Sequence, residues 1–158
     1  MIFVTVGAQM HFDRLIRAVD EWARDRGRHD VFAQVGPSEY DARSIETVRF
    51  LDPPAFRARV EQATAVVAHA GMGTIITALE VGKPLLVFPR ESARRETRND
   101  HQVATARHFA SSGRVLAAFD DEELRRELDV IESFRPGVRI GQQASRELIA
   151  RIRGFVAG

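Results

Sequence analysis

Residues 66–84 read VVAHAGMGTIITALEVGKP, and the apolar run LLVFP continues the chain at 85–89. A short β-branched segment runs into two glycines, after which apolar residues recur at helical spacing until Gly82 and Pro84 end the pattern. This order predicts a strand, a tight turn, a helix and a second strand. Glycines let a ligand approach the backbone closely, and the free N–H groups and positive dipole end of a helix start favour an anion there.

Two polar residues make this turn a candidate phosphate site. His69 and Thr74 stand on either side of Gly71 and Gly73 and add hydrogen-bond donors. The glycines alone leave two interpretations open, because many α/β domains place a Gly-x-Gly after a strand only to let the helix pack tightly. A purely structural turn would more naturally carry small apolar residues at positions 69 and 74. The combination therefore favours a phosphate or diphosphate ligand.

Length and composition indicate one globular domain spanning residues 1–158, with 44% hydrophobic and 28% charged residues. The net charge of +1 comes from 23 basic and 22 acidic residues mixed along the chain, which argues against nucleic acid as a partner. The absence of cysteine excludes disulfides and thiolate metal sites and fits the cytoplasm. We expect neither a leader nor a spanning helix, which needs roughly 18 apolar residues, so that any membrane association depends on another component.

The rest of the chain alternates strand and helix patterns. Strands are expected at residues 2–6, 31–35, 47–51, 65–68, 85–88 and 114–119. Helices are expected at 12–22, after Asp52, from the glycine turn to Val81, at 101–111, after Asp120 and at 138–156. Such alternation predicts an α/β fold, a doubly wound Rossmann-like parallel sheet of about six strands. Ligands of such sheets bind beyond the carboxyl ends of the strands, where the turns at 7–9, 71–73 and 89–90 meet.

A polar segment without periodicity, residues 89–98, follows the fifth expected strand. It contains four arginines, and long loops in compact domains are often functional. Glu91 and Glu96 cancel part of this charge, so a solvated loop is the alternative interpretation for most of the arginines. Asn99 and Asp100 follow and are expected either to cap the next helix or to contact a ligand.

Two common nucleotide sites are unlikely from the motifs. A dinucleotide site needs Gly-x-Gly-x-x-Gly after the first strand and an acid about 20 residues further on, whereas the first turn here has one glycine. A P-loop needs a Lys-Ser/Thr pair after its glycines, and Lys83 stands at the wrong end of the helix. The sequence therefore argues against a nicotinamide dehydrogenase and against a P-loop enzyme.

Several motifs together resemble a known family. They are HAGMGT at 69–74, GKP at 82–84 and NDHQ at 99–102, with FVTVG at 3–7 and FDRLI at 12–16 near the start. In this order they resemble the C-terminal, donor-binding domain of glycosyltransferase family 28, of the GT-B fold. The resemblance covers nearly the whole chain. It is closest to the small subunits of split enzymes, namely the catalytic subunit of the eukaryotic dolichol-linked N-acetylglucosamine transferase and the smaller subunit of bacterial exopolysaccharide glucuronosyltransferases.

The resemblance implies a donor site residue by residue. The turn and helix start would hold the nucleotide diphosphate, a role that falls on His69, Gly71, Met72, Gly73 and Thr74. The first glycine turn, at Gly7 and Ala8, would lie near the same phosphates, and backbone after the third strand, at Phe50 and Leu51, would meet the uracil. The sugar hydroxyls would be met by Asp100 and Gln102, with Asn99 and His101 beside them.

One departure from the family pattern concerns the ribose. Many relatives carry an acid five residues before the glycine of Gly-Lys-Pro, where this chain has Thr77. Glu80 lies about one turn further along the same helix and is the candidate substitute.

The resemblance also implies a partner, because a GT-B transferase forms its site between two Rossmann-like domains. This chain would bind a UDP-sugar, while a separate membrane-anchored subunit would bind a lipid-linked acceptor and hold the complex at the inner face of the membrane. Transfer would be inverting, with His69 as the catalytic residue stabilising the departing diphosphate, helped by the turn amides and by one or more of Arg90, Arg94, Arg95 and Arg98. The general base would lie on the partner, and neither cofactor nor metal is expected.

Two questions stay open: the identity of the transferred sugar and the role of the last helix. Arginines in the 89–98 loop favour glucuronic acid, with glucose and N-acetylglucosamine as alternatives. The helix at 138–156 is expected to pack Leu148 and Ile149 inward, and its end at Phe155 and Val156 either completes this core or docks on the partner.

Other interpretations are kept beside this one. The chain could be a non-catalytic nucleotide-sugar binding or regulatory module, or an unrelated phosphate-binding enzyme such as a phosphatase or reductase. Asp120 and Asp121 are expected to cap a helix rather than bind metal, and Phe50 is expected in the core rather than as a base-stacking platform. The remaining histidines are expected at the surface, namely His11, His29 and His108.

Overall fold

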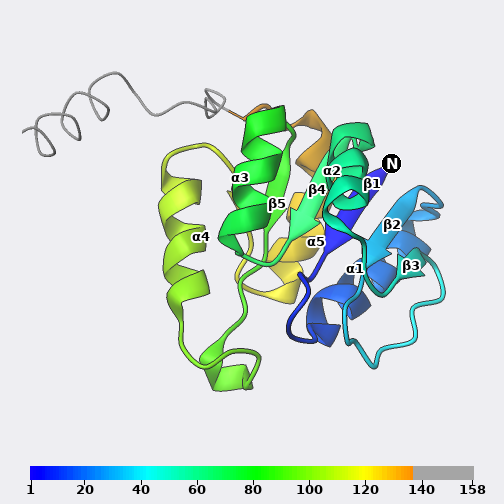
Figure 1. The fold of residues 1–158 in the computed structure, drawn as a ribbon, viewed down its shortest axis with the longest axis horizontal. Helices are drawn as coiled ribbons and strands as arrows, with labels where there is room; N and C mark the ends of the chain where they lie inside the picture. Colours follow the sequence, from blue (N-terminus) through cyan, green and yellow to red (C-terminus); the bar gives the residue numbers. More distant parts are fainter. Residues whose placement is uncertain (137–158) are drawn as a thin grey trace, which may run out of the picture.

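The computed structural model describes residues 1–136 as an α/β unit around one six-stranded sheet (Figure 1). The strands are β1 (Ile2–Thr5), β2 (Val31–Gln34), β3 (Glu46–Val48), β4 (Ala65–Ala68), β5 (Leu85–Val87) and β6 (Leu116–Ala117). Their order is β3-β2-β1-β4-β5-β6, and every neighbouring pair is parallel. The predicted fold class is confirmed. The helix expected at 138–156 lies outside the described residues.

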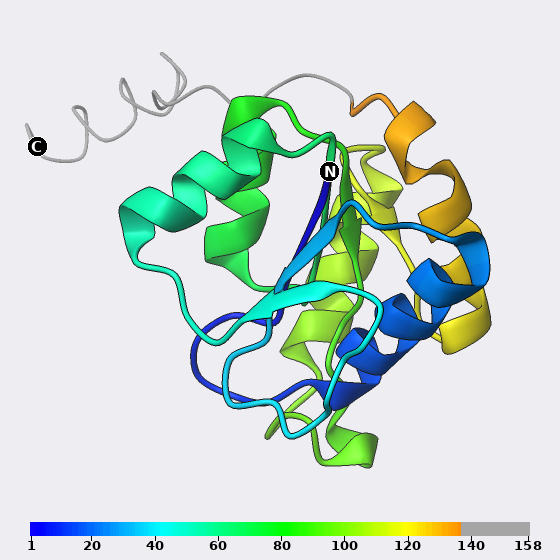
Figure 2. The same ribbon diagram turned by 90° about the vertical axis from the view of Figure 1, so that its right-hand side faces the viewer.

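Helices cover both faces of the sheet (Figure 2). They are α1 (Asp13–Arg26), α2 (Pro53–Gln62), α3 (Met72–Val81), α4 (His101–Ser111) and α5 (Asp121–Val130), with the 3₁₀ turns η1 (Ser92–Arg94) and η2 (Ile131–Ser133). One apolar cluster joins α1 and α5 to the sheet, and a second joins α2, α3 and α4 to its other face. Successive strand residues alternate between the clusters, as Ile2 and Phe3 do, because side chains of a strand point to opposite faces.

Local signals predicted the helix starts well. Asp52 accepts a hydrogen bond from the Ala55 N–H at 2.8 Å and Asp120 accepts one from the Glu123 N–H at 2.7 Å, so both cap their helices as expected. The two edge strands are shorter than predicted, since each pairs on one side only. Phe50 lies beyond β3 and is 52% exposed, so the expectation that it belongs to the core is wrong.

The order of the strands creates a switch point between β1 and β4. The chain builds the sheet outward from β1 through β2 to β3, then returns to the other side of β1 and continues through β5 to β6. The loops that leave β1 and β4 therefore diverge at the carboxyl edge, which opens a crevice there. Among residues 1–136, none of the helices has the length and apolar character needed to cross a bilayer.

Candidate functional site

The start of α3 presents free backbone donors at this switch point. Gly71 precedes the helix in an extended conformation and provides no side-chain cap. Its own N–H donates to the His69 carbonyl at 2.8 Å, whereas the N–H groups of Met72, Gly73 and Thr74 have no acceptor within residues 1–136. Together with the helix dipole, three free N–H groups at the crevice form a site suited to an anion.

The imidazole of His69 lies between two glycines from different loops. A Cβ added to Gly71 would fall 2.2 Å from His69 Nε2, and one added to Gly7 would fall 2.7 Å from its Cε1. Gly7 also has a φ of +80°, a conformation that favours glycine. Both loops thus need glycine because the imidazole fills the space where a side chain would stand.

The surroundings of His69 keep its ring neutral. Its Nδ1 is buried and has no hydrogen-bond partner within the described chain. Burial, helped by the nearby positive charge of Arg90, lowers the pKa of His69 to about 4. At neutral pH the ring therefore offers a hydrogen bond rather than a full charge to a ligand.

A cavity of about 370 Å³ opens beside His69, and a second of about 430 Å³ adjoins it through shared lining residues. The first is lined by residues 6–10, His69, Gly71, Arg90, Thr97, His101 and Gln102. The second is lined by Gln9, Met10, Thr97, Arg98, Asn99 and His101. Neither lining contains an aspartate or a glutamate, so the joined cavity is suited to a negatively charged ligand.

Arg90, in the loop that follows β5, supports the first loop of the site. Its side chain is buried, with 4% of the residue exposed, and one guanidinium nitrogen donates to the carbonyls of Val6 at 2.8 Å and Met10 at 2.6 Å. The Nε atom is buried without a partner, and burial lowers the pKa of Arg90 to about 10. Arg90 therefore fixes the β1–α1 loop and brings a cation to the cavity wall.

The NDHQ motif divides between two sides of its loop. Gln102 is buried at the cavity wall and accepts a hydrogen bond from the Arg90 N–H at 3.1 Å, and His101 lines both cavities. Asn99 lines the outer cavity and accepts from the His101 N–H at 3.3 Å, as a helix cap does. Asp100 is the N-cap residue of α4, but its carboxylate turns away from that helix and accepts from the Ser92 N–H of η1 at 2.8 Å. That carboxylate lies beside a different hollow, with Arg107 and Phe119.

Other predicted site residues lie away from the cavity. Glu80 is in the last turn of α3 and faces Arg57 of α2, with Oε2 3.6 Å from a guanidinium nitrogen. Phe50 and Leu51 stand between β3 and α2 at the carboxyl edge but line neither cavity. Among the loop arginines, Arg98 lines the outer cavity, whereas Arg94 is exposed and 3.3 Å from Glu91. No group of three or more metal-ligating side chains occurs in the part of the chain that the structure describes.

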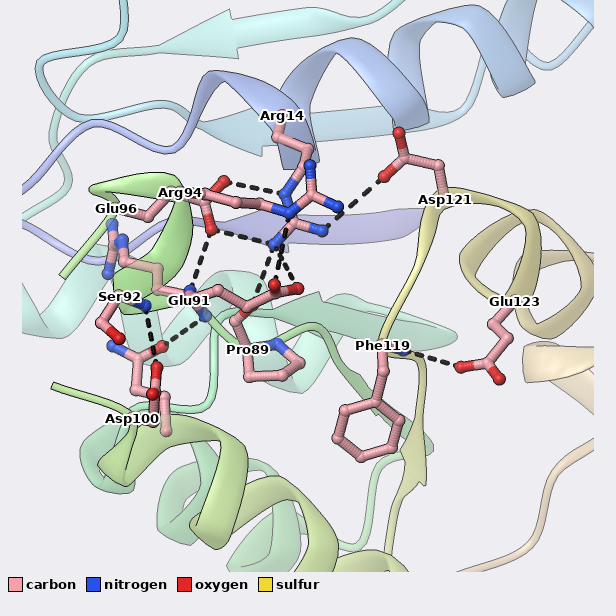
Figure 3. A network of polar contacts seen from close by, with 12 residues as sticks. Arg14, Pro89, Glu91, Ser92, Arg94, Glu96, Asp100, Phe119, Asp121 and Glu123 are labelled. Atoms are coloured by element: carbon pink, nitrogen blue, oxygen red, sulfur yellow. Dashed lines mark hydrogen bonds and ion pairs between the residues drawn. The ribbon is translucent and has the colours of Figure 1, made fainter.

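Arg14 lines neither cavity but contacts the loop that forms one wall of the site, a role that sequence reasoning missed. From the first turn of α1 it donates two hydrogen bonds to Glu96, at 2.8 and 2.9 Å, and a third to the Pro89 carbonyl at 3.1 Å (Figure 3). The guanidinium also lies over the Phe88 ring, 4.1 Å from its centre. The sequence placed Arg14 in the FDRLI motif, but nothing local to that motif indicates a partner 82 residues away.

Comparison with known proteins gives one family and several structural neighbours. The model of the glycosyltransferase family 28 C-terminal domain matches residues 1–146. The human protein "UDP-N-acetylglucosamine transferase subunit ALG13" is 28% identical over 127 residues, which cover 73% of this chain and 11% of that protein. The chain thus spans about a tenth of the length of this curated relative.

Two solved structures share the fold at low identity. An NMR structure of ALG13 has a TM-score of 0.60 and 18% identity and covers 96% of this chain and 93% of that one. The Methanocaldococcus jannaschii UDP-GlcNAc 2-epimerase, solved with UDP-GlcNAc and UDP, has a TM-score of 0.64 and 12% identity and covers 98% of this chain and 45% of that one. At these identities the likeness concerns the architecture.

Proposed function

Because the chain belongs to the glycosyltransferase family 28 C-terminal domains, we propose that it is the donor-binding catalytic subunit of a two-chain inverting glycosyltransferase. The observation that carries this proposal is the free start of α3 beside His69, at the switch point of the sheet. In this proposal the diphosphate of a UDP-sugar accepts hydrogen bonds from the N–H groups of Met72, Gly73 and Thr74 and from the neutral imidazole of His69.

The sugar would occupy the joined cavity. Gln102 and Thr97 offer polar groups to hydroxyls, and Arg98 offers a cation at the outer end. The uridine would extend toward Phe50 and Leu51, which stand at the same edge of the sheet. Asp100 would need to turn from Ser92 to reach a hydroxyl, and Glu80 would need to leave Arg57 to reach a ribose. We therefore keep Gln102 as the main sugar contact and give Asp100 and Glu80 a secondary place.

In the proposed reaction, an acceptor hydroxyl oxygen attacks the anomeric carbon on the face opposite the diphosphate. The bond between that carbon and the phosphate oxygen breaks, its electron pair stays on the oxygen, and the configuration at the carbon inverts. His69 and the amides at the α3 start stabilise the charge that develops on the leaving group. The hydroxyl proton passes to a general base, which we assign to the partner because no carboxylate lines the cavity.

The partner would be a membrane-anchored subunit that binds a lipid-linked acceptor, so that the complex works at the cytoplasmic face of a membrane. Support comes from the human relative, whose name describes a subunit of a transferase. It also comes from four large apolar side chains exposed around the carboxyl edge, namely Met10, Phe50, Met72 and Ile76. An apolar surface beside a ligand site is suited to a protein that closes over it.

For the sugar we favour glucuronic acid, as in exopolysaccharide synthesis. A carboxylate fits a cavity that has Arg98 and Arg90 in its walls and no acid. N-acetylglucosamine, which the human relative's name mentions, and glucose are the alternatives.

Thermal unfolding with UDP tests the donor site. UDP at about 100 times its dissociation constant should stabilise the fold by about 2.7 kcal/mol. No rise in Tm at millimolar UDP would favour an unrelated phosphate-binding enzyme.

Transfer is tested by co-expression with a membrane-anchored Rossmann-like protein from a neighbouring gene and a panel of UDP-sugars. Binding without transfer in that complex would favour a non-catalytic nucleotide-sugar module.

A further inference from the structure

The loop between β5 and α4 forms one wall of the joined cavity. It carries Arg90, Thr97, Arg98 and Asn99 directly, and it leads into His101 and Gln102 at the start of α4. Apart from the short η1 turn, the loop has no regular structure of its own. The positions of six cavity-lining residues therefore depend on what holds this loop.

Arg14 holds this loop from α1, in addition to the two hydrogen bonds that join Arg90 to the carbonyls of Val6 and Met10. The two bonds of Arg14 to Glu96 and its bond to the Pro89 carbonyl join the first turn of α1 to both ends of the loop (Figure 3). Glu96 in turn accepts from the Glu91 N–H at 3.0 Å, so that the same carboxylate also closes the loop on itself. The side chains of Arg14 and Glu96 are only 11% and 12% exposed, which makes this ion pair stronger than one on an open surface.

The Arg14–Glu96 ion pair also affects which charges are available at the cavity wall. Glu96 and Glu91 are neighbours of cavity residues in sequence, and both turn toward Arg14, at 2.8 and 3.5 Å. Without Arg14, the Glu96 carboxylate would lose its ion-pair partner and would be free to approach Arg90 and Arg98 and to compete with an anionic ligand, whereas Glu91 would keep its contact with Arg94 at 3.3 Å. The ion pair therefore leaves the cations of this wall available.

We propose that Arg14 is a positioning residue, which through Glu96 holds the loop wall that recognises the sugar part of the donor. The identity of the ligand rests on the proposed function, whereas the hold on the loop rests on the contacts alone. The amides at the α3 start come from another loop, so the diphosphate contacts should not depend on Arg14.

The first test measures amide hydrogen exchange of residues 90–100 in the full chain without ligand. Arg14→Met keeps an apolar stem over Phe88 but removes the charge and the donors, and we expect exchange in this loop to accelerate at least tenfold. Arg14→Lys retains one charged donor, so its rate of exchange in this loop should lie between the rates of Arg14→Met and of the native chain. The control is Arg125→Ala, which breaks ion pairs of Arg125 with Glu21 and Asp25 between α5 and α1 and should leave the loop unchanged.

The second test compares binding of UDP with binding of UDP-glucuronate, UDP-glucose and UDP-N-acetylglucosamine. For the UDP-sugar that the native chain binds best, Arg14→Met should weaken binding on the order of tenfold, while UDP changes less than twofold. Equal losses for UDP and UDP-sugar would reduce Arg14 to a merely structural residue and overturn the proposal. Unchanged exchange of residues 90–100 in Arg14→Met would overturn it as well.

The two tests separate this inference from the proposed function. A native chain that binds neither UDP nor any UDP-sugar would contradict the proposed function. In that case the exchange experiment still decides whether Arg14 holds the loop.

Discussion

The two edges of the sheet satisfy their polar groups in different ways. At the carboxyl edge, four buried side-chain atoms of the described chain have no hydrogen-bond partner: Arg14 Nη1, Gln34 Oε1, His69 Nδ1 and Arg90 Nε. At the amino edge, Arg28 pairs with Asp30 at 2.7 Å and Glu132 at 2.9 Å, and Asp129 binds both Arg26 and Trp22. Unpaired buried polar groups cost stability, so the carboxyl edge is the less fully satisfied of the two, and His69 and Arg90 carry such atoms at the cavity wall. This difference supports the proposed ligand site at the carboxyl edge.

The largest effect should come from filling the space of the imidazole. Gly71→Ala would place a Cβ 2.2 Å from His69 Nε2, so the ring must move, and we expect a loss of about 2 kcal/mol in unfolding free energy together with loss of UDP binding. Chemical denaturation and calorimetry would measure both.

Gly73→Ala is the matched control for stability. Nothing lies within 4 Å of a Cβ added at Gly73, so the unfolding free energy should not fall. If both variants lost the same stability, crowding of His69 could not be the reason that Gly71 is a glycine.

A smaller effect should follow from removing the imidazole itself. His69→Ala deletes one neutral donor from the diphosphate site and should weaken UDP binding roughly tenfold, or about 1.4 kcal/mol. Arg28→Ala at the amino edge should leave the affinity for UDP unchanged, and equal effects of the two variants would remove the functional distinction between the edges.

At the same carboxyl edge, a change on the sugar side of the site should affect binding of a UDP-sugar but not binding of UDP. Gln102→Ala removes a side chain from the cavity wall and should weaken a UDP-sugar by about 1 kcal/mol while UDP itself is hardly affected. Titration of both ligands measures the difference. A similar loss for UDP would mean that Gln102 acts through the Arg90 N–H that it accepts from, and not through the sugar.

The smallest effect on stability should come from the amino edge, and it should depend on pH. Arg28 and the N-terminal amine lower the pKa of Asp30 to about 2, so its ion pairs stabilise the fold above its ordinary pKa and are lost as pH falls toward 2. Asp30→Asn should cost well under 1 kcal/mol at pH 7, because the pair is partly exposed, and clearly less at pH 2, where about half of the folded carboxylates are protonated. Urea unfolding at both pH values tests this, and a cost at pH 2 as large as that at pH 7 would contradict the assignment.

Much of the fold follows from local signals in the sequence. The bounds of α4 and the caps at Asp52 and Asp120 were predictable because each depends on residues close in the chain. The carboxyl-edge turns were predictable as well, since strand alternation implies a parallel sheet and so places Gly7 and His69 at one edge.

What escaped prediction depends on distant partners. Glu96 appeared to be a charge that weakens an arginine loop, but it pairs with Arg14, 82 residues away. Glu80 pairs with Arg57 from another helix, and the Asp100 carboxylate binds the Ser92 N–H of η1, an element that the polar sequence of this loop did not indicate. Sequence patterns give the face or turn on which a side chain stands, but the choice among several opposite charges is made only when the elements pack.

The wide spacing of the residues around the cavity also bears on synthesis of the protein. Its walls come from the first ten residues, from His69 and Gly71, and from a stretch that ends at Gln102. On a translating ribosome, the nascent chain therefore has no complete cavity until α4 has left the exit tunnel. The central strand β1 cannot complete its pairing until its neighbour β4, which begins 63 residues later, has been synthesised. A bound ligand can therefore influence folding only near the end of the folding process.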